Sequence, residues 1–408
     1  MFLVYEVLLV LALIAALPYF LITGVRRGKY LANFPERMGF YRTPPAAHDL
    51  WIHAVSVGET SAARPVVDEI LRRRPATSIV FTTTTITGQA QARRLFPEAT
   101  VTYFPIDFAA SVKRFLAHHH PRAFATMETE ICPNVTRLAR ARGLRLVLAN
   151  GRISDRSFPR YRFFRPVVRR VLRHYEHILA REETDRARFI AIGAPPSSVE
   201  ISGNVKFDYV PDARPLEMAP QLGQLIAGRK VLVLASTMPG EDETLLPAVE
   251  RLVRERDAFV IVAPRKPERF EMVAAMLDDA VRRSQLAVRR SSFLLLDSVG
   301  ELARIYRYAT CAFIGGSLLP GVGGHNPIEA AAVGVPVCFG PYMSNFREIA
   351  ATFLRHDAAV EARSATDVVA FAAQMFDDST MGERSRRVVE QNRGAAARTA
   401  ARIVELLA

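Results

Sequence analysis

Short apolar runs alternate along this chain with stretches of helical periodicity, starting near residue 50. Each short run bounded by turn residues predicts a buried strand, and each longer periodic stretch predicts a helix that crosses back over the sheet. In the first half the predicted strands are Leu50–Val55, Ser78–Thr83, Val101–Phe104, Ala123–Met127 and Leu144–Ala149, and the predicted helices are Thr60–Arg73 and Gly88–Leu95. This alternation is typical of an α/β fold with a parallel sheet.

A second series follows a stretch rich in Pro and Gly. Its predicted strands are Lys230–Ala235, Ala258–Ala263, Phe293–Leu296, Cys311–Ile314 and Val335–Phe339. A chain of 408 residues is long enough for two cores, so we expect two Rossmann-like domains. The expected division is an N-terminal domain at 25–208, a linker at 209–228, a C-terminal domain at 229–390 and a terminal helix at 391–408. Ligands of open parallel sheets bind beyond the carboxyl ends of the strands, which predicts chemistry in a cleft between the domains.

The N-terminal segment is apolar from residue 2 to residue 22, except for Tyr5, Glu6 and Tyr19, and Pro18 interrupts it near its end. A helix of this length spans about 31 Å, close to the hydrocarbon thickness of a bilayer. The basic residues that follow it are Arg26, Arg27 and Lys29, which predicts that the rest of the chain is cytoplasmic. We therefore predict a membrane anchor at residues 1–24. Because Glu6 and Pro18 weaken a clean span, the alternative is an apolar helix buried in the domain or lying along the membrane surface.

Composition narrows the choice of partners. The 54 basic residues exceed the 41 acidic ones by 13, which favours phosphates, anionic lipid or nucleic acid. The three cysteines have no paired or metal-type spacing, so reduced cytosolic thiols are expected. The tract His118–His120 precedes Pro121 at a helix-to-strand turn and has no Cys or carboxylate cluster beside it, so we do not expect it to bind metal.

The segment 313–346 carries the most informative chemical pattern. A predicted strand ends in residues 315–317, a glycine-rich loop follows, and Asn326-Pro327 opens a predicted helix. Exposed N–H groups and the helix dipole then predict a phosphate site, and Glu329 lies where a carboxylate accepts ribose hydroxyls. The structural alternative is a glycine-rich turn with a first-turn Glu. Because His325, Asn326 and Glu329 occur together with the glycine-rich loop, we favour a ligand-binding role over the structural alternative.

Seven other motifs occur along the chain. They are S-V-G-E-T at 56–60, E-T-E-I-C-P-N at 128–134, N-G-R-I-S-D-R-S at 150–157, G-N-V-K-F-D at 203–208, A-S-T at 235–237, A-P-R-K-P-E-R-F at 263–270 and D-S-V-G-E-L at 297–302. In this order, and with the glycine-rich segment, they make nearly the whole chain similar to the Kdo transferases of lipopolysaccharide synthesis, Kdo being 3-deoxy-D-manno-octulosonic acid. The resemblance implies a two-domain GT-B fold with an N-terminal membrane anchor.

The resemblance further implies an inverting glycosyltransferase that moves Kdo from CMP-Kdo to a lipid A precursor, lipid IVA. Such an enzyme would work on the cytoplasmic face of the bacterial inner membrane, in contact with its lipids, without metal, cofactor or nucleic acid. The similarity places the catalytic base on Glu59, whose structural alternative is a helix-opening Glu. The chain departs from the family pattern at three positions: Cys132, Met238 and Tyr342 stand where the family usually has Trp, His and His. These differences affect the expected contacts with the acceptor and the phosphate, and they leave the expected reaction class unchanged.

The candidate site residues fall into two groups. Lys206 and Arg265 are expected to balance the charge of the departing phosphate because no aspartate pair marks a Mg²⁺ site, and surface charges are the alternative. The full set expected to bind the donor is Lys206, Ser236, Thr237, Arg265, Gly316, Ser317, Gly324, His325, Asn326 and Glu329. The set expected to bind the acceptor is Glu128, Glu130, Arg152 and Arg156, with ion pairing to nearby Arg as the alternative for the two glutamates.

Eight arginines between residues 152 and 173 are interleaved with aromatic residues. This stretch either binds lipid phosphates and an anionic membrane face or forms a solvated helix whose Arg stems cover apolar surface. Two other functions are compatible with parts of the pattern. One is a two-domain enzyme that uses a UDP-sugar. The other is a basic protein of membrane surfaces or nucleic acid with a degenerate cleft, for which the glycine-rich segment would have no purpose.

Overall fold

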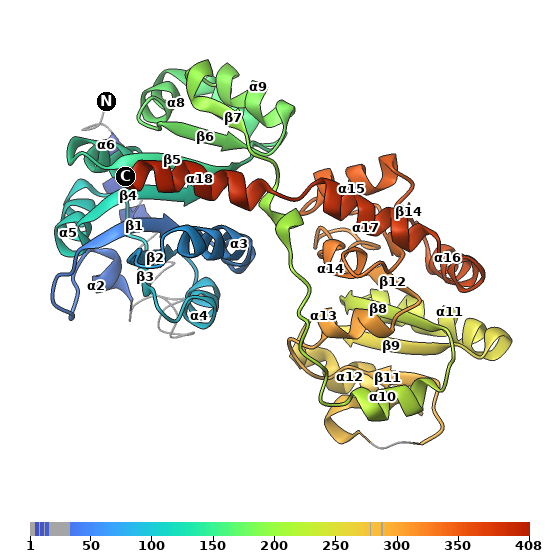
Figure 1. Ribbon diagram of the computed structural model, residues 1–408. Helices are drawn as coiled ribbons and strands as arrows, with labels where there is room; N and C mark the ends of the chain where they lie inside the picture. The colour runs from blue at the N-terminus through green and yellow to red at the C-terminus, as the bar shows by residue number, and fades with distance from the viewer. Residues whose placement is uncertain (1–4, 8, 12, 16–32, 278, 287–288) are drawn as a thin grey trace. The chain divides into compact units, whose positions relative to one another are not determined.

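The computed structural model describes residues 5–7, 9–11, 13–15, 33–277, 279–286 and 289–408 (Figure 1). The chain divides into two compact units. The N-terminal unit comprises residues 1–208 together with 393–408, and the C-terminal unit comprises residues 209–392.

The N-terminal unit is built on a sheet of seven parallel strands in the order β3-β2-β1-β4-β5-β6-β7. The strands are β1 (His48–His53), β2 (Ile79–Thr83), β3 (Thr100–Tyr103), β4 (Pro121–Met127), β5 (Arg145–Gly151), β6 (His177–Ala180) and β7 (Val199–Ile201). The helices are α2 (Phe34–Arg37), α3 (Val57–Arg73), α4 (Ile86–Leu95), α5 (Ala109–His119), α6 (Pro133–Ala141), α7 (Phe158–Phe163), α8 (Arg165–Leu172), α9 (Glu183–Ala191) and α18 (Ala395–Leu407). Strands buried on both faces explain the continuous apolar runs in the sequence.

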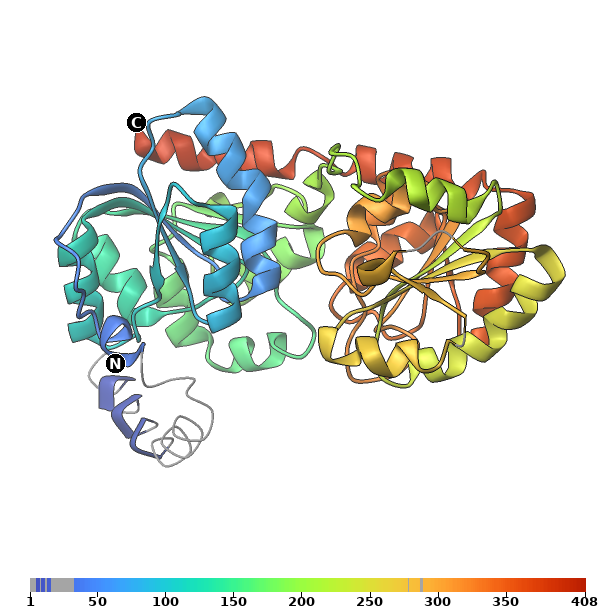
Figure 2. The ribbon, with the colours of Figure 1, turned by 90° about the horizontal axis from the view of Figure 1, so that it is seen from below.

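Helices cover both faces of this sheet. Side chains of α3, α4 and α18 share one apolar core with the sheet, and side chains of α5, α6, α8 and α9 share the other. The C-terminal helix α18 packs against α3, as Figures 1 and 2 show. Its N-terminus is capped by Asp208, whose carboxylate accepts hydrogen bonds from the N–H groups of Gly394 (2.6 Å) and Ala396 (2.7 Å). The last residues of the chain therefore complete the core of the first unit.

The C-terminal unit has its own sheet of seven parallel strands, in the order β10-β11-β9-β8-β12-β13-β14. The strands are β8 (Val231–Thr237), β9 (Phe259–Pro264), β10 (Val281–Arg282), β11 (Phe293–Leu295), β12 (Cys311–Ile314), β13 (Val337–Phe339) and β14 (Ala359–Glu361). The helices are α10 (Ala219–Ile226), α11 (Glu241–Arg256), α12 (Phe270–Ala274), α13 (Leu302–Ile305), α14 (Ile328–Ala331), α15 (Arg347–Arg355), α16 (Ala365–Asp377) and α17 (Met381–Gln391). One of its cores is formed by α11 and α16 against the sheet.

The two-domain α/β prediction is confirmed, and every strand predicted in the sequence is present. The division of the chain differs in two places. The stretch expected to be a linker contains helix α10 and belongs to the C-terminal unit. The expected terminal helix begins later, because residues 392–394 separate α17 from α18, and Gly394 there adopts φ +97°.

Two polar side chains dock the described part of the N-terminal segment on the first unit. The Tyr5 hydroxyl donates to Asp107 Oδ2 (2.8 Å). Glu6 Oε1 accepts from Asn134 Nδ2 (2.8 Å) and from the backbone N–H of Ala109 (2.8 Å). Burial raises the pKa of Asp107 to about 6. Tyr5 and Glu6, which interrupt the apolar pattern, are thus hydrogen-bonded to the folded unit.

The opposite side of this helical segment is apolar and exposed. Its exposed side chains, at helical spacing, are Val7, Val10, Leu11 and Ile14. Among the described residues, no helix combines the length and the apolar character needed to cross a bilayer. The predicted anchor at residues 1–24 lies largely outside the described residues.

Candidate active site

The sequence-predicted residues lie at the carboxyl ends of the central strands in each unit. Strand order reverses between β1 and β4 in the first sheet and between β8 and β12 in the second, and such switch points are where open α/β sheets bind ligands. Glu59 lies in the first turn of α3, just after β1, and Glu128 follows β4 directly. Ser236 lies at the end of β8 and Gly316 follows β12. Each unit therefore presents candidate residues at its own switch point.

Glu59 is a partly buried carboxylate with an unusual proton affinity. Its Oε2 atom accepts a hydrogen bond from the Val55 N–H (2.8 Å), and its Oε1 atom accepts one from the Ser56 hydroxyl (3.1 Å). Burial, together with the negative charges of Glu128 and Glu130, raises the pKa of Glu59 to about 7, although both hydrogen bonds oppose the shift. Glu59 also lies in the first turn of α3, as the structural alternative of a helix-opening Glu requires. This position coexists with a pKa that suits a general base at neutral pH.

Glu128 and Glu130 have different surroundings. Glu128 forms an ion pair with the buried Arg181. Burial raises the pKa of Glu128, but the charges of Arg181, Lys206 and Arg152 outweigh it, so the pKa is lowered. For Glu130, burial and the charge of Glu128 raise the pKa. The ion pairing foreseen as the alternative role of Glu128 is thus observed.

Arg181, at the end of β6, was missed in the sequence. It donates to the Asn150 carbonyl (3.1 Å) as well as pairing with Glu128. An isolated Arg after a short strand gives no signal in a single sequence, and only the parallel pairing of β5 and β6 brings it beside β4.

Three polar residues at strand ends have left-handed backbone conformations. These are Glu128 (φ 60°), Asn150 (φ 55°) and Ser236 (φ 56°). Such conformations cost about 1–3 kcal/mol for residues other than Gly and persist where the surrounding structure enforces them, often at functional sites. Their location at three strand ends of the two sheets supports functional roles for these loops.

The loop after β12 is held by a buried carboxylate that the sequence analysis did not single out. Glu241, the first residue of α11, is only 1 % exposed. Its Oε2 accepts from the N–H groups of Met238 (2.9 Å) and Gly316 (2.7 Å), and its Oε1 accepts from those of Ser317 (3.0 Å) and Leu318 (2.9 Å). Four backbone donors therefore converge on one internal anion.

This arrangement corrects the predicted phosphate site. The N–H groups of Gly316 and Ser317 were expected to face a phosphate, but they donate to Glu241. The helix expected after Asn326-Pro327 is the four-residue α14, too short for a strong N-terminal dipole site. The sequence did contain a signal for Glu241, because the pair Gly240-Glu241 follows a predicted strand just as Gly58-Glu59 does.

His325, Asn326 and Glu329 lie together beside that loop. His325 Nδ1 lies 2.8 Å from the Gly315 carbonyl oxygen, so a hydrogen bond there requires Nδ1 to carry the proton. Burial lowers the pKa of His325, and Arg265 contributes in the same direction. Asn326 Oδ1 accepts from the Ile328 N–H (3.1 Å), and its Nδ2 donates to Glu329 Oε1 (3.3 Å).

Glu329 and the basic candidates complete the donor group. Burial raises the pKa of Glu329, against the opposing effects of Asn326 and Arg265. Arg265 is exposed and acts electrostatically on His325 and Glu329, which places it with the expected donor residues. Lys206 belongs to the N-terminal unit, where its charge acts on Glu128. The structure thus groups Lys206 with the acceptor candidates.

The arginine-rich stretch forms α7 and α8. Val168, Val171 and Leu172 face the core, whereas the neighbouring Phe163 is 79 % exposed. Arg156 is exposed. An exposed aromatic beside arginines is consistent with a lipid-facing surface, and the buried valines show that α8 also has a structural role.

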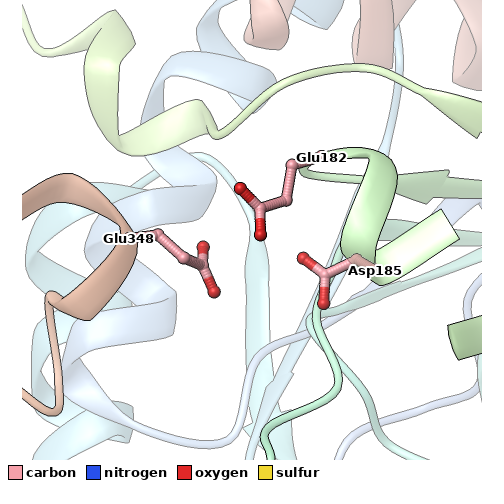
Figure 3. A group of neighbouring side chains, drawn as sticks. All are labelled: Glu182, Asp185 and Glu348. Carbon is pink, nitrogen blue, oxygen red and sulfur yellow. The ribbon is translucent and has the colours of Figure 1, made fainter. Parts of the chain in front are cut away.

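Further carboxylates lie at the ends of helices in both units. Figure 3 shows Glu182 and Asp185 at the start of α9, in the N-terminal unit, and Glu348 in the first turn of α15, in the C-terminal unit. Asp185 Oδ1 accepts from the Ile153 N–H (2.8 Å) and so supports the loop after β5. These residues belong to separate units, and we assign no cation site to them.

Comparison with known proteins identifies the family. Residues 32–209 match the family model described as 3-deoxy-D-manno-octulosonic-acid transferase (kdotransferase). A 3-deoxy-D-manno-octulosonic acid transferase of Haemophilus influenzae is 32 % identical over 388 residues, which cover 91 % of each chain. The chain belongs to the Kdo transferase family. A Kdo transferase of Bordetella pertussis is 34 % identical over 89 % of this chain and 88 % of its own.

Among solved structures, UDP-GlcNAc 2-epimerase from Neisseria meningitidis matches 89 % of this chain and 99 % of its own, with a TM-score of 0.59 and 12 % identity. That likeness concerns the fold, which consists of two parallel-sheet α/β domains that resemble those of GT-B glycosyltransferases. As a Kdo transferase the chain is a glycosyltransferase of lipopolysaccharide synthesis, as the motifs predicted.

Proposed function

We propose that this Kdo transferase takes Kdo from CMP-Kdo and attaches it to a hydroxyl of a lipid A precursor by a single inverting displacement. Glu59 removes the proton of the acceptor hydroxyl, and the resulting oxygen nucleophile attacks the anomeric carbon of Kdo. The bond from that carbon to the phosphate oxygen breaks, and CMP leaves with the bonding electrons. One carbon–oxygen bond forms and one breaks, and the proton stays on Glu59.

One observation supports this assignment above all others. The pKa of Glu59 is raised to about 7, at the carboxyl end of the central strand β1. A carboxylate with an ordinary pKa is a weak base. A carboxylate whose pKa lies near the working pH is still ionised in a sizeable fraction of molecules and has a stronger driving force for taking a proton. Glu128, paired with Arg181, keeps a low pKa and suits a role in holding acceptor hydroxyls through its carboxylate oxygens.

On the donor side, Glu329 is proposed to accept the ribose hydroxyls of CMP. Its partner Asn326 fixes one carboxylate oxygen. Arg265 acts electrostatically on both His325 and Glu329, which supports a role in balancing phosphate charge. Lys206, whose charge acts on Glu128, supports the acceptor side of the proposal. Under this proposal the reaction needs neither a divalent metal nor another cofactor.

The proposed location is the cytoplasmic face of the bacterial inner membrane. The apolar segment 2–22, with basic residues after it, supports attachment there. The exposed apolar stripe of Val7, Val10, Leu11 and Ile14 is the part of this segment that would meet lipid. The arginine-rich stretch with exposed Phe163 would face lipid headgroups, and no nucleic acid is expected as a partner.

The test is incubation of the full chain with CMP-Kdo and a tetraacylated lipid A precursor, followed by mass analysis of the lipid. A mass increase of one or more Kdo units, undiminished by a strong chelator, is the expected result. A parallel incubation with UDP-GlcNAc is expected to leave the lipid unchanged. Calorimetric preference for UDP over CMP, or strict dependence on added Mg²⁺, would count against the proposal.

A further inference from the structure

The carboxylate of Glu241 links the first helix of the C-terminal unit to the glycine-rich loop. The four N–H donors described above leave neither of its oxygens without a partner. Met238 lies before α11, whereas Gly316, Ser317 and Leu318 lie after β12. One side chain therefore ties together the loops that follow two neighbouring central strands.

Hydrogen bonds continue from this loop to the candidate donor residues. The Gly316 carbonyl accepts from the Gly324 N–H (2.7 Å), and the Gly315 carbonyl lies 2.8 Å from His325 Nδ1. A Cβ atom on Gly316 would lie 2.6 Å from His325 Nδ1, so the imidazole packs directly on the loop backbone. The position of Gly316 thus fixes where His325 and the turn leading to Asn326 lie.

The hydroxyl of Ser317 also anchors this loop, through two hydrogen bonds to the backbone. The Ser317 hydroxyl donates to the Ile314 carbonyl and accepts from the Gly340 N–H (2.8 Å). A Cβ atom on Gly340 would lie 2.2 Å from the Ser317 carbonyl oxygen. The loop therefore has little room to adjust, and its conformation depends on the acceptor that its N–H groups share.

We propose that Glu241 is a positioning residue for donor binding, an internal anion that occupies the loop amides and thereby holds Gly316 and His325 in the donor-binding arrangement. It follows that the donor phosphate does not bind to the N–H groups of residues 316–318. The phosphate is instead met by side chains, Arg265 among them. This inference rests on the CMP-sugar donor proposed above and adds a residue that does not touch the donor.

Glu241→Gln is the sharpest change because it keeps the shape of the side chain. An amide has one oxygen in place of two, so its NH₂ group would face two N–H donors that then lack an acceptor. The loop is expected to shift, raising KM for CMP-Kdo by about 10-fold or more, with KM for the lipid acceptor nearly unchanged. Glu241→Asp, which keeps the carboxylate on a shorter stem, is expected to give an intermediate KM for the donor.

Asp242→Asn is the matched control. Asp242 is the next residue, is fully buried, and pairs with Arg269 (2.5 Å) rather than with the loop amides. This variant is expected to lower the melting temperature without the selective rise in KM for CMP-Kdo. A role of Glu241 in general stability alone would give both variants the same kinetic pattern.

Steady-state kinetics with each substrate varied in turn, and calorimetric titration with CMP, decide the matter. A donor-selective loss in the Gln variant, partly restored in the Asp variant, supports the inference. Unchanged donor KM and CMP affinity in folded Glu241→Gln would overturn it, and if that variant does not fold, unchanged values in Glu241→Asp would do so. Failure of the wild-type chain to bind CMP would instead contradict the proposed function.

Discussion

Both units contain a Gly-Glu dipeptide at the same place in the fold, but the two glutamates have different hydrogen-bond partners and surroundings. In each, a Gly-Glu pair lies at the start of the helix after the first central strand: Gly58-Glu59 in the first turn of α3, and Gly240-Glu241 as the N-cap and first residue of α11. Glu241, which is almost fully buried, accepts four backbone hydrogen bonds. Glu59 accepts one backbone N–H and one hydroxyl, and it lies near two further carboxylates.

The difference teaches that donors and neighbouring charges, rather than residue type, decide what a buried carboxylate does. Four N–H donors make Glu241 a fixed acceptor with no capacity left for a substrate. Burial beside Glu128 and Glu130 makes the ionised form of Glu59 less favourable and raises its pKa to about 7. Glu241 therefore organises a loop, whereas Glu59 is suited to exchange a proton.

The largest effect is expected from Glu59→Gln. Gln retains an acceptor for the Val55 N–H but cannot take a proton, so kcat should fall by about 10² to 10⁴ while CMP affinity stays the same. Ser56→Ala, which removes only the hydroxyl contact to Glu59, is the control and should retain most of the activity. Near-normal turnover of Glu59→Gln would refute its role as the base.

The same variant tests the cost of the raised pKa. In wild type, ionisation of Glu59 is disfavoured in the folded state, so stability is lost as pH rises from its ordinary pKa, about 4.3, to about 7. Gln does not titrate. The melting temperature of Glu59→Gln relative to wild type should therefore increase between pH 5 and pH 8, as measured by calorimetry at both values. A constant difference would contradict the raised pKa.

Next in size is the loss of the buried ion pair beside the proposed base. Arg181→Ala leaves Glu128 buried without this partner, and the free energy of unfolding should fall by about 3 kcal/mol. Arg402→Ala is the control because Arg402 pairs with Glu200 at the surface, where a loss of about 1 kcal/mol or less is expected. Denaturant titration of both variants provides the comparison, and equal losses would contradict a special role for Arg181.

A smaller effect is expected on the pH profile when one neighbouring charge is removed. The wild-type kcat/KM should rise with pH through an inflection near 7, as Glu59 loses its proton. Glu130→Gln removes one of the charges that raise this pKa, so the inflection should move to lower pH by about one unit or less. An inflection that stays in place would show that Glu130 does not act on the base.

The smallest effect concerns the N-terminal segment. Tyr5→Phe removes the hydrogen bond to Asp107 and should weaken docking of the helix by about 1 kcal/mol. Limited proteolysis should then cleave the N-terminal segment faster. Tyr342→Phe, at an exposed position in the other unit, is the control and should leave the cleavage rate unchanged. Equal cleavage rates for both variants would show that the Tyr5 contact does not hold the helix.

Much of this fold follows from the sequence alone. Apolar runs such as Leu50–Val55 and Cys311–Ile314 predict the central strands because a strand covered on both faces must be apolar throughout. Strands β6, β7, β10 and β14 were not predicted; the last three lie at sheet edges and have only two or three residues. The motif order also sufficed to place the chain in its family. The roles it suggests for Glu59, Glu329 and Arg265 stay predictions.

Only the tertiary structure decided how those residues are used. Burial raises the pKa of Glu59, and the charge of Glu128 raises it further, although Glu128 is far away in sequence and lies nearby only because β1 and β4 are neighbours. In the same way, Glu241 and Gly316 are 75 residues apart and meet only because β8 pairs with β12. The sequence determines which groups carry charge or can donate hydrogen bonds. The pKa of a carboxyl group, and which donors it accepts from, depend on distances that exist only once the sheets have formed.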